Sequence, residues 1–364
     1  MKYKNIYVAA SNQHVGKTTS TLGLVSTLLQ KDINVGYCKP VGQKYLMDVL
    51  VDKDTLLFAD LIKFDVEPSL HSPVVLPSRT VQNFIKNPDE HDFEERIIRA
   101  KEELNQRHEV TIFEGTGHPG VGSVVSLSNA RVAKLLDAGV IMIVEGGIGS
   151  TIDMLNMCTA LFREEGVPII GVIINKVRAD KMNKVKEYLS VWLERNNIPL
   201  LGLMLYDERL AYPLMSTVAD SIKATVELNK HKLDNRVESM LAGSLVEVKE
   251  LEAYQNLLLI ASYRTLDRAI KKVNFFSKRE NVADCPLSGV IVTGEGDIDE
   301  ETIEYIKRHE LPFLRTKFDT YGAVLKISRI EVKINRHTPW KIRRAIELIK
   351  SNINLDTVLE SSKI

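Results

Sequence analysis

The residues with the clearest capacity for chemistry lie near the N-terminus, where Ser11-Asn12-Gln13-His14-Val15-Gly16-Lys17-Thr18-Thr19 follows the apolar run 6–10. An apolar-faced helical pattern begins directly afterwards, over residues 20–25. A strand, a tight turn and a helix in this order are what a phosphate-binding P-loop requires. Backbone N–H groups of the turn and the positive end of the helix dipole both favour a phosphate anion.

Within this loop, Lys17 would reach the terminal phosphates of a nucleotide, and the Thr18 hydroxyl would ligate Mg²⁺. We expect the nucleotide to contact the loop and the first helical turn: Asn12, Gln13, His14, Val15, Gly16, Lys17, Thr18 and Thr19. The pattern G-x-x-x-x-G-K-[ST] requires Gly where this chain has Ser11. Taken alone, the stretch therefore also fits an ordinary strand-to-helix turn.

Carboxylates at two other positions extend the prediction to a metal site. Glu114 follows the apolar strand 110–113, and Asp54, with Asp52 as a weaker candidate, lies at the start of a predicted helix. Because Mg²⁺ takes a few protein oxygen ligands together with water and phosphate, Thr18, Asp54 and Glu114 form the predicted metal set. The alternative is that the Asp carboxylates only complement a helix dipole and that Glu114 is a turn residue.

Two further polar residues end predicted strands. Lys39 follows the strand 34–38 and would add positive charge near the γ-phosphate or an acidic substrate. Since phosphoryl transfer depends on positioning and charge neutralisation, Lys17 and Lys39 are the predicted catalytic residues. Asn175 follows the strand 169–174 and could bond a purine edge. Lys39 precedes a proline, and it fits a solvated turn equally well.

The elements that must position these residues alternate along the chain. Continuous apolar strands at 140–144 and 200–205 are separated by helical patterns near 151–165 and 181–195. Such strands, buried on both faces, predict an α/β fold: a P-loop-type parallel sheet with helices on both faces. We expect a turn at 39–43, where the second strand ends.

The length of 364 residues predicts two domains. We expect the P-loop domain at 1–215, a linker or polar amphipathic helix at 216–235, and a smaller α/β domain at 236–364. In the last of these, Arg264 follows a strand and could bind an anion.

Composition narrows the range of partners. The 48 basic and 48 acidic residues give a formal net charge of zero, so we expect no nucleic-acid partner and no anionic membrane surface. Because a predicted strand begins almost at the first residue, we expect no signal segment, and no apolar run approaches membrane-spanning length. The three cysteines lie far apart in the sequence, which fits reduced cysteines, and we therefore expect a cytoplasmic protein.

Taken together, the loop, Lys39-Pro40-Val41, Asp54, Glu114-Gly115 and Asn175 resemble the dethiobiotin synthetase family. The resemblance spans residues 3–215. It is closer still to the dethiobiotin-synthetase-like N-terminal domain of some bacterial phosphate acetyltransferases, since Ala10-Ser11 replaces Gly-Thr before the loop. The part after 236 resembles the DRTGG domain that follows in those proteins, through Ser262-Tyr263-Arg264-Thr265 and Val292-Thr293-Gly294-Glu295.

The resemblance implies binding of Mg-ATP, a homodimer, and a small-molecule ligand or an assembly role for the second domain. Ser11-Asn12-Gln13 departs from the Thr-Asp-Thr segment of the synthetases, and the serine that contacts substrate after Lys-Pro-Val is replaced near Gln43. Two hypotheses follow. The first is a regulatory or metabolite-sensing ATPase. The second is an ATP-dependent ligase of the dethiobiotin synthetase or cobyrinic acid a,c-diamide synthase type, activating a carboxylate or carbamate.

Overall fold

The chain folds into two compact units in a computed structural model, which describes residues 3–43, 45–46, 51–243, 255–279, 285–330, 332–335 and 338–356. Unit 1 comprises Met1–Asp207 and Ile334–Ile364, and unit 2 comprises Glu208–Lys333. Within the described ranges, no helix combines the length and the apolar character needed to cross a membrane.

Unit 1 is built on a six-stranded sheet in the order β10-β9-β8-β1-β7-β2, and all its neighbouring strands are parallel. The strands are β1 (Asn5–Ala10), β2 (Val35–Cys38), β7 (Val110–Glu114), β8 (Gly139–Glu145), β9 (Ile169–Val177) and β10 (Leu200–Leu205). Strands β1, β2, β7, β8 and β9 are buried along nearly their whole length because helices cover both faces of the sheet, whereas the edge strand β10 is only partly buried. The predicted α/β fold with a parallel sheet is confirmed.

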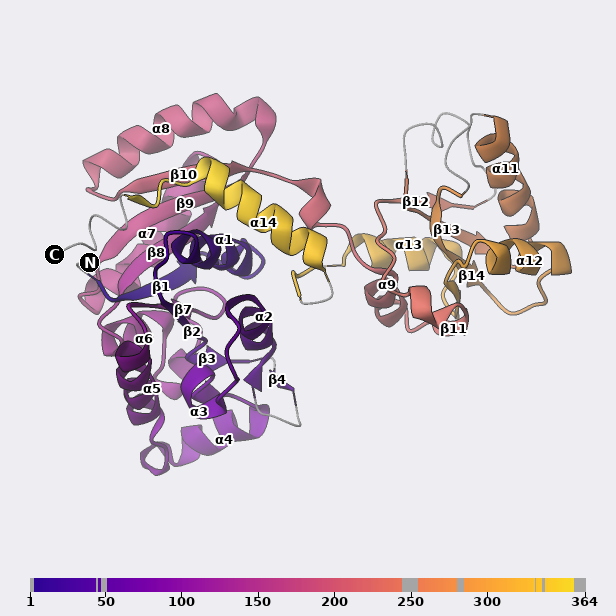
Figure 1. The fold of residues 1–364 in the computed structure, drawn as a ribbon. Coiled ribbons are helices and arrows are strands. Elements are labelled where there is room, and N and C mark those ends of the chain that lie inside the picture. Colours follow the sequence, from indigo (N-terminus) through magenta and orange to yellow (C-terminus); the bar gives the residue numbers. More distant parts are fainter. Residues whose placement is uncertain are drawn as a thin grey trace. The chain divides into compact units, whose positions relative to one another are not determined.

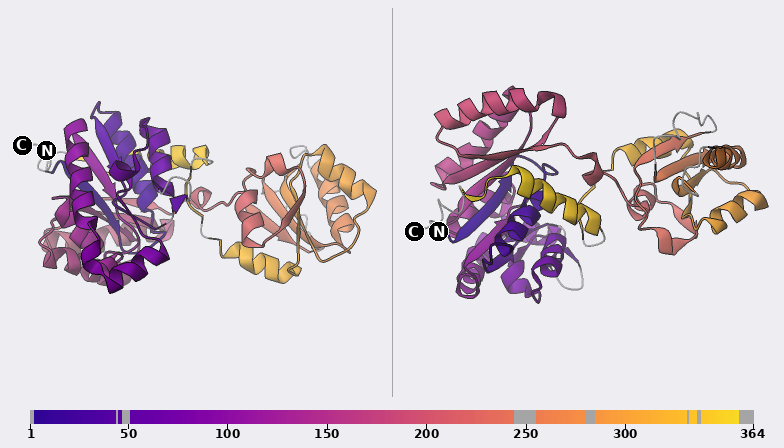
Figure 2. Two further views of the ribbon diagram at one scale, coloured as in Figure 1. Left: turned by 90° about the horizontal axis from the view of Figure 1, so that it is seen from below. Right: turned by 45° about the horizontal axis from the view of Figure 1, so that its top comes forward.

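Four helices share one apolar core with one face of this sheet. They are α5 (Phe93–Arg107), α6 (Asn129–Leu135), α7 (Gly149–Glu164) and α8 (Met182–Arg195). On the opposite face lie α1 (Lys17–Leu29) and α14 (Pro339–Asn352), which pack side by side (Figures 1 and 2). Gly23 of α1 makes this packing close, since a Cβ there would lie 2.2 Å from the Ile349 side chain.

Shorter elements surround the carboxyl end of the sheet. They are α2 (Lys53–Ile62), α3 (Pro68–His71), α4 (Ser78–Lys86), β3 (Val41–Gly42), β4 (Tyr45–Leu46), β5 (Val51–Asp52), β6 (Val74–Val75), η1 (Pro88–Glu90), η2 (Ser123–Val125) and η3 (Ala179–Lys181). The predicted turn at 39–43 is partly wrong, because β3 pairs in parallel with β6.

Unit 2 contains a five-stranded sheet in the order β11-β15-β14-β13-β12, in which only the β11–β15 pair is antiparallel among the described pairings. Its strands are β11 (Thr225–Leu228), β12 (Ser239–Ala242), β13 (Leu257–Ser262), β14 (Leu287–Thr293) and β15 (Phe313–Thr316). One apolar core contains α11 (Leu266–Arg279) and α12 (Glu300–Arg308), and the other contains α9 (Met215–Ser221) and α13 (Thr320–Ser328). The 3₁₀ turns η4 (Glu208–Leu210) and η5 (Lys230–Lys232) complete the unit.

The division of the chain differs from the expected boundaries in two ways. The segment 216–235, expected to be a linker or a helix, includes most of α9 and all of β11, which belong to the second core and the second sheet. The segment from Ile334 does not belong to unit 2, because α14 returns to pack on α1 of unit 1. Apolar periodicity favours a helix in a segment but does not indicate which surface that helix covers, so the sequence pattern could not assign α14 to unit 1.

Candidate functional site

The loop after β1 has the local geometry of an anion site. Gly16, which precedes α1, has a φ of 108°, in the left-handed region where a side chain is strained. No side chain caps this end of α1, and its first turn carries no acidic residue. The N–H groups of the first turn lack partners within the helix, so the loop and the helix dipole present uncompensated positive potential.

Lys17 begins α1 and turns back across the loop. Its Nζ donates to the carbonyl oxygen of Asn12 at 3.2 Å and to that of Gly117 at 2.7 Å. The ammonium therefore lies between the phosphate loop and the segment that follows β7.

The sheet order brings the other charged residues to the same place. Because β7 lies between β1 and β2, Glu114 at its carboxyl end lies between the loop after β1 and Lys39 after β2. Asp54 comes from the first turn of α2, whose Phe58 ring stacks on Tyr37 of β2 with centroids 3.8 Å apart. This stacking fixes α2 against the strand that ends beside Lys39.

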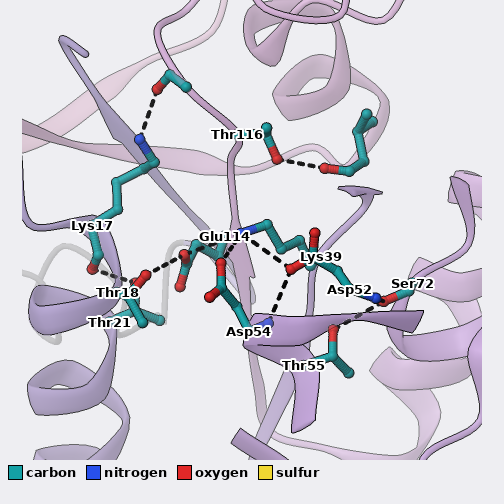
Figure 3. Close-up of polar contacts among 12 residues, drawn as sticks. Lys17, Thr18, Thr21, Lys39, Asp52, Asp54, Thr55, Ser72, Glu114 and Thr116 are labelled. Atoms are coloured by element: carbon teal, nitrogen blue, oxygen red, sulfur yellow. Dashed lines mark hydrogen bonds and ion pairs between the residues drawn. The ribbon is translucent and has the colours of Figure 1, made fainter. Parts of the chain in front are cut away.

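Three carboxylates surround the buried ammonium of Lys39 (Figure 3). Its Nζ forms an ion pair with Asp54 and lies 3.4 Å from Glu114 Oε1 and 3.7 Å from Asp52 Oδ1. Asp52 also caps α2, since its side chain accepts a hydrogen bond from the N–H of Asp54 at 3.0 Å. Asp52, predicted mainly as a partner of the helix dipole, therefore both caps the N-terminus of α2 and lies beside the Lys39 ammonium.

Burial and charge act in opposite directions on these groups. Burial disfavours the charged form of Lys39, but Asp54, Glu114 and Asp52 outweigh it and hold the pKa of the ammonium well above its usual range. Burial raises the pKa of Glu114, and this effect exceeds the opposing influence of Lys39. Three carboxyl groups therefore share one largely buried ammonium.

Glu114 and Thr18 supply the donor atoms suited to a divalent cation. Thr18 Oγ1 donates to Glu114 Oε1 at 3.0 Å, while the buried Oε2 of Glu114 has no hydrogen-bond partner. A buried carboxylate oxygen without a partner is costly, so an added cation suits this position. In the described part of the chain, no three His, Cys, Asp or Glu side chains form a metal cage by themselves. That is compatible with Mg²⁺, which completes its shell with water and phosphate.

Asn175 lies under the phosphate loop. Its Nδ2 donates to the carbonyl oxygen of Val15 at 2.7 Å, and its Oδ1 accepts from the N–H of Lys176 at 2.8 Å. A Cβ at Gly16 would lie 2.2 Å from this Nδ2, which gives the glycine a second, steric reason. The amide supports the loop, and its predicted contact with a purine stays a prediction.

The remaining loop residues differ in exposure. Asn12 and Gln13 are exposed, whereas Val15 is buried, and His14 adopts a left-handed φ of 59°. Asn129, the first residue of α6, was not among the predicted site residues, yet it is buried and hydrogen-bonded to the segment after Glu114. Only its position directly after the helix cap Ser128 is visible in the sequence, and that gives no sign of its contacts.

Comparison with known proteins agrees with this geometry. Residues 4–213 match the AAA_26 family model, described as an AAA domain. The chain belongs to the AAA_26 family. This AAA domain covers most of unit 1, including the phosphate loop, Lys39, Asp54 and Glu114.

Relatives of the AAA domain fall into different classes. A phosphate acetyltransferase from Nitrosomonas europaea is 21% identical over 97% of this chain and 51% of that protein, so the chain spans about half the length of this relative. An ATP-dependent dethiobiotin synthetase BioD from Methanococcus vannielii is 27% identical over 55% of this chain and 92% of that protein. Among solved structures, the MinC:MinD cell division protein complex of Aquifex aeolicus matches 57% of this chain and 83% of that chain at 15% identity, with a TM-score of 0.38.

Proposed function

We propose that unit 1 binds ATP together with Mg²⁺ at the carboxyl end of its sheet. The observation that carries this proposal is the unpartnered, buried Oε2 of Glu114, whose other oxygen accepts from the Thr18 hydroxyl at the uncapped N-terminus of α1. Membership of the AAA_26 family and similarity to an ATP-dependent enzyme support it.

The residues have distinct roles in this proposal. The loop N–H groups over 12–19 hold phosphate oxygens, and Lys17 neutralises the terminal phosphates. Thr18 and Glu114, with Asp54 beside them, hold the cation, which supplies charge neutralisation during phosphoryl transfer. Lys39 keeps the carboxylates compatible with burial and adds positive charge toward the transferred group.

We further propose that the protein is a regulatory or metabolite-sensing ATPase whose second unit binds a small ligand or mediates assembly. The similarity to the phosphate acetyltransferase supports this, because it extends over 97% of the chain and therefore includes unit 2. The dethiobiotin synthetase matches only 55% of the chain. In this role, ATP hydrolysis would be slow.

The second candidate is an ATP-dependent ligase that activates a carboxylate or carbamate. It is favoured by the coverage of the dethiobiotin synthetase, of which 92% aligns with this chain. Rescue of a biotin-auxotrophic deletion host by this gene would support the ligase. Failure of rescue by a protein that still binds ATP would support the sensing role.

A homodimer is part of the same proposal, from the resemblance to dethiobiotin-synthetase-like domains. Size-exclusion chromatography with light scattering checks it, with and without Mg-ATP. A mass near 41.0 kDa under both conditions would contradict it.

Thermal unfolding with and without Mg-ATP tests nucleotide binding. A ligand that binds only the folded state at about 100 times its Kd should stabilise unit 1 by about 2.7 kcal/mol. Lys17→Ala should abolish this shift. Lys31→Ala, which replaces an exposed lysine just after the C-terminus of α1, should leave it unchanged. An equal shift for Lys17→Ala and the unmodified protein would contradict the assignment of the phosphate loop.

A further inference from the structure

Asn129 uses its side-chain amide to organise the segment that follows Glu114. Its Nδ2 donates to the carbonyl oxygens of Thr116 at 2.8 Å and His118 at 2.6 Å. Its Oδ1 accepts the N–H of Thr116 at 3.0 Å and the hydroxyl of Tyr7 at 2.6 Å. Both N–H donors and both acceptor positions of the amide are therefore engaged, and the residue is only 4% exposed.

The chemistry of the partners defines the orientation of this amide. Two carbonyl oxygens can only accept, so they require the NH₂ group on their side. Burial raises the pKa of the Tyr7 phenol, which stays protonated and donates to Oδ1. An aspartate at 129 would lose both donors and would place negative charge against two carbonyl oxygens.

The segment has little freedom to take another path. A Cβ at Gly115 would lie 2.5 Å from Asn129 Oδ1 and 2.9 Å from the Tyr7 hydroxyl. Thr116 donates its hydroxyl to the carbonyl oxygen of Val41, which ties the segment to the strand after Lys39. Asn129 is therefore the centre of a fixed turn over residues 115–118.

This turn contacts the nucleotide site from two directions. Glu114 precedes it directly in the chain. The carbonyl oxygen of Gly117, which lies between the two residues bonded to Asn129, accepts the 2.7 Å hydrogen bond from Lys17 Nζ. The amide of Asn129 thereby fixes the backbone that sets the place of the ammonium.

We propose that Asn129 is a positioning residue of the nucleotide site: through the turn 115–118 it holds the Gly117 carbonyl against Lys17 and fixes the backbone next to Glu114. The inference rests on the proposed function, since it concerns the groups that would contact the terminal phosphate and the cation. Tyr7 assists through the hydroxyl bond to Oδ1, and Asn129 itself touches no nucleotide.

The test compares Asn129→Ala with Asn5→Ala in the full chain. Asn5 is a matched control because it is a buried asparagine of β1 whose Nδ2 donates to the carbonyl oxygen of Leu136 at 2.7 Å, at the opposite end of the sheet. We expect Asn129→Ala to weaken Mg-ATP binding by about tenfold, as is typical when a residue that orients the binding groups without touching the ligand is removed. Binding of ADP should weaken less, because Lys17 and the cation act mainly on the terminal phosphates.

If Asn129 had only a structural role, Asn129→Ala would change the melting temperature but not the ratio of the ADP and ATP dissociation constants. Asn5→Ala should lower the melting temperature but leave the ratio of the ADP and ATP dissociation constants unchanged. The ratio should fall for Asn129→Ala and fall less for Tyr7→Phe, which removes one of the hydrogen bonds. An unchanged ratio in Asn129→Ala, in a protein whose parent binds ATP, would overturn the inference and leave the proposed function standing.

Hydrogen exchange of the nucleotide-free protein gives a readout that does not depend on binding. Asn129→Ala should accelerate amide exchange over 115–120, and Asn5→Ala should not. If the segment in Asn129→Ala were protected as well as in the unmodified protein, the inference would be overturned, whether or not the parent protein binds ATP. Failure of the parent protein to bind ATP would, separately, contradict the proposed function.

Discussion

The two units place very different chemistry at the carboxyl ends of similar parallel strands. In unit 2, Ser262, Thr293 and Thr316 lie in register on three neighbouring strands. Their hydroxyl groups are satisfied within the unit: Ser262 bonds Thr265, Thr293 bonds Thr320, and Thr316 donates to the carbonyl oxygen of Ile222.

The corresponding edge of unit 1 holds buried charge instead. Lys39 has three carboxylates around it, and one oxygen of Glu114 has no partner. The edge of a parallel sheet therefore does not make a site by itself. What distinguishes unit 1 is charge held in place by burial and left incompletely compensated.

The largest effect should come from removing the central ammonium. Lys39→Met leaves Asp54, Glu114 and Asp52 buried without their cation, and should lower the free energy of unfolding of unit 1 by about 3–5 kcal/mol. Urea denaturation followed by tryptophan fluorescence is suited to this measurement, since both tryptophans, Trp192 and Trp340, lie in unit 1.

The exposed pair of Lys31 with Asp356 is the matched control for this change. Their side chains are 43% and 66% exposed, so Lys31→Ala should cost less than about 1 kcal/mol. If Lys39→Met and Lys31→Ala lowered the free energy of unfolding equally, the buried cluster around Lys39 would be no more important for stability than an exposed ion pair.

A smaller, pH-dependent effect should come from Glu114→Gln. Because the folded pKa of Glu114 is raised above its ordinary value of 4.5, its ionisation favours the unfolded chain. The unmodified protein should therefore lose stability, relative to Glu114→Gln, as the pH rises from about 4.5 through the folded pKa. Urea denaturation at pH 4 to 8 checks the sign, and a stability difference that is constant over this range would contradict it.

The smallest expected effect lies in unit 2. Arg264 is exposed and its Nε donates to the Tyr263 hydroxyl at 2.9 Å, outside the AAA domain. Arg264→Ala should change the affinity for Mg-ATP by less than about twofold if the two sheet edges act independently. Isothermal titration calorimetry measures this, and a several-fold loss would show that the units are coupled.

Much of the site was predictable because its signals are local. The apolar run 6–10, Gly16 and Lys17 follow one another in the chain, and backbone geometry requires little else to form the loop. Thr18 was predicted from the phosphate-loop pattern, and Asp54 and Glu114 from their positions at a helix start and a strand end. The structure brings Asp54 and Glu114 together at Lys39 and places Thr18 on Glu114.

Other features depended on pairings that no local pattern encodes. The order of strands places Glu114 between the phosphate loop and Lys39, and a different order would have separated them. The return of α14 onto α1 depends on surfaces more than 300 residues apart in the sequence, such as Gly23 and Ile349. Asn129 likewise gains its role only when α6 packs beside the turn 115–118.

The α/β alternation and the phosphate loop follow from local sequence, because strand burial, helix periodicity and the conformational freedom of Gly16 act over a few residues. Long-range packing, in contrast, sets the ion pairs around Lys39, the limits of the two units and the contacts of Asn129. These depend on which distant groups share a volume from which water is excluded, where an unpaired charge or an unsatisfied amide is costly.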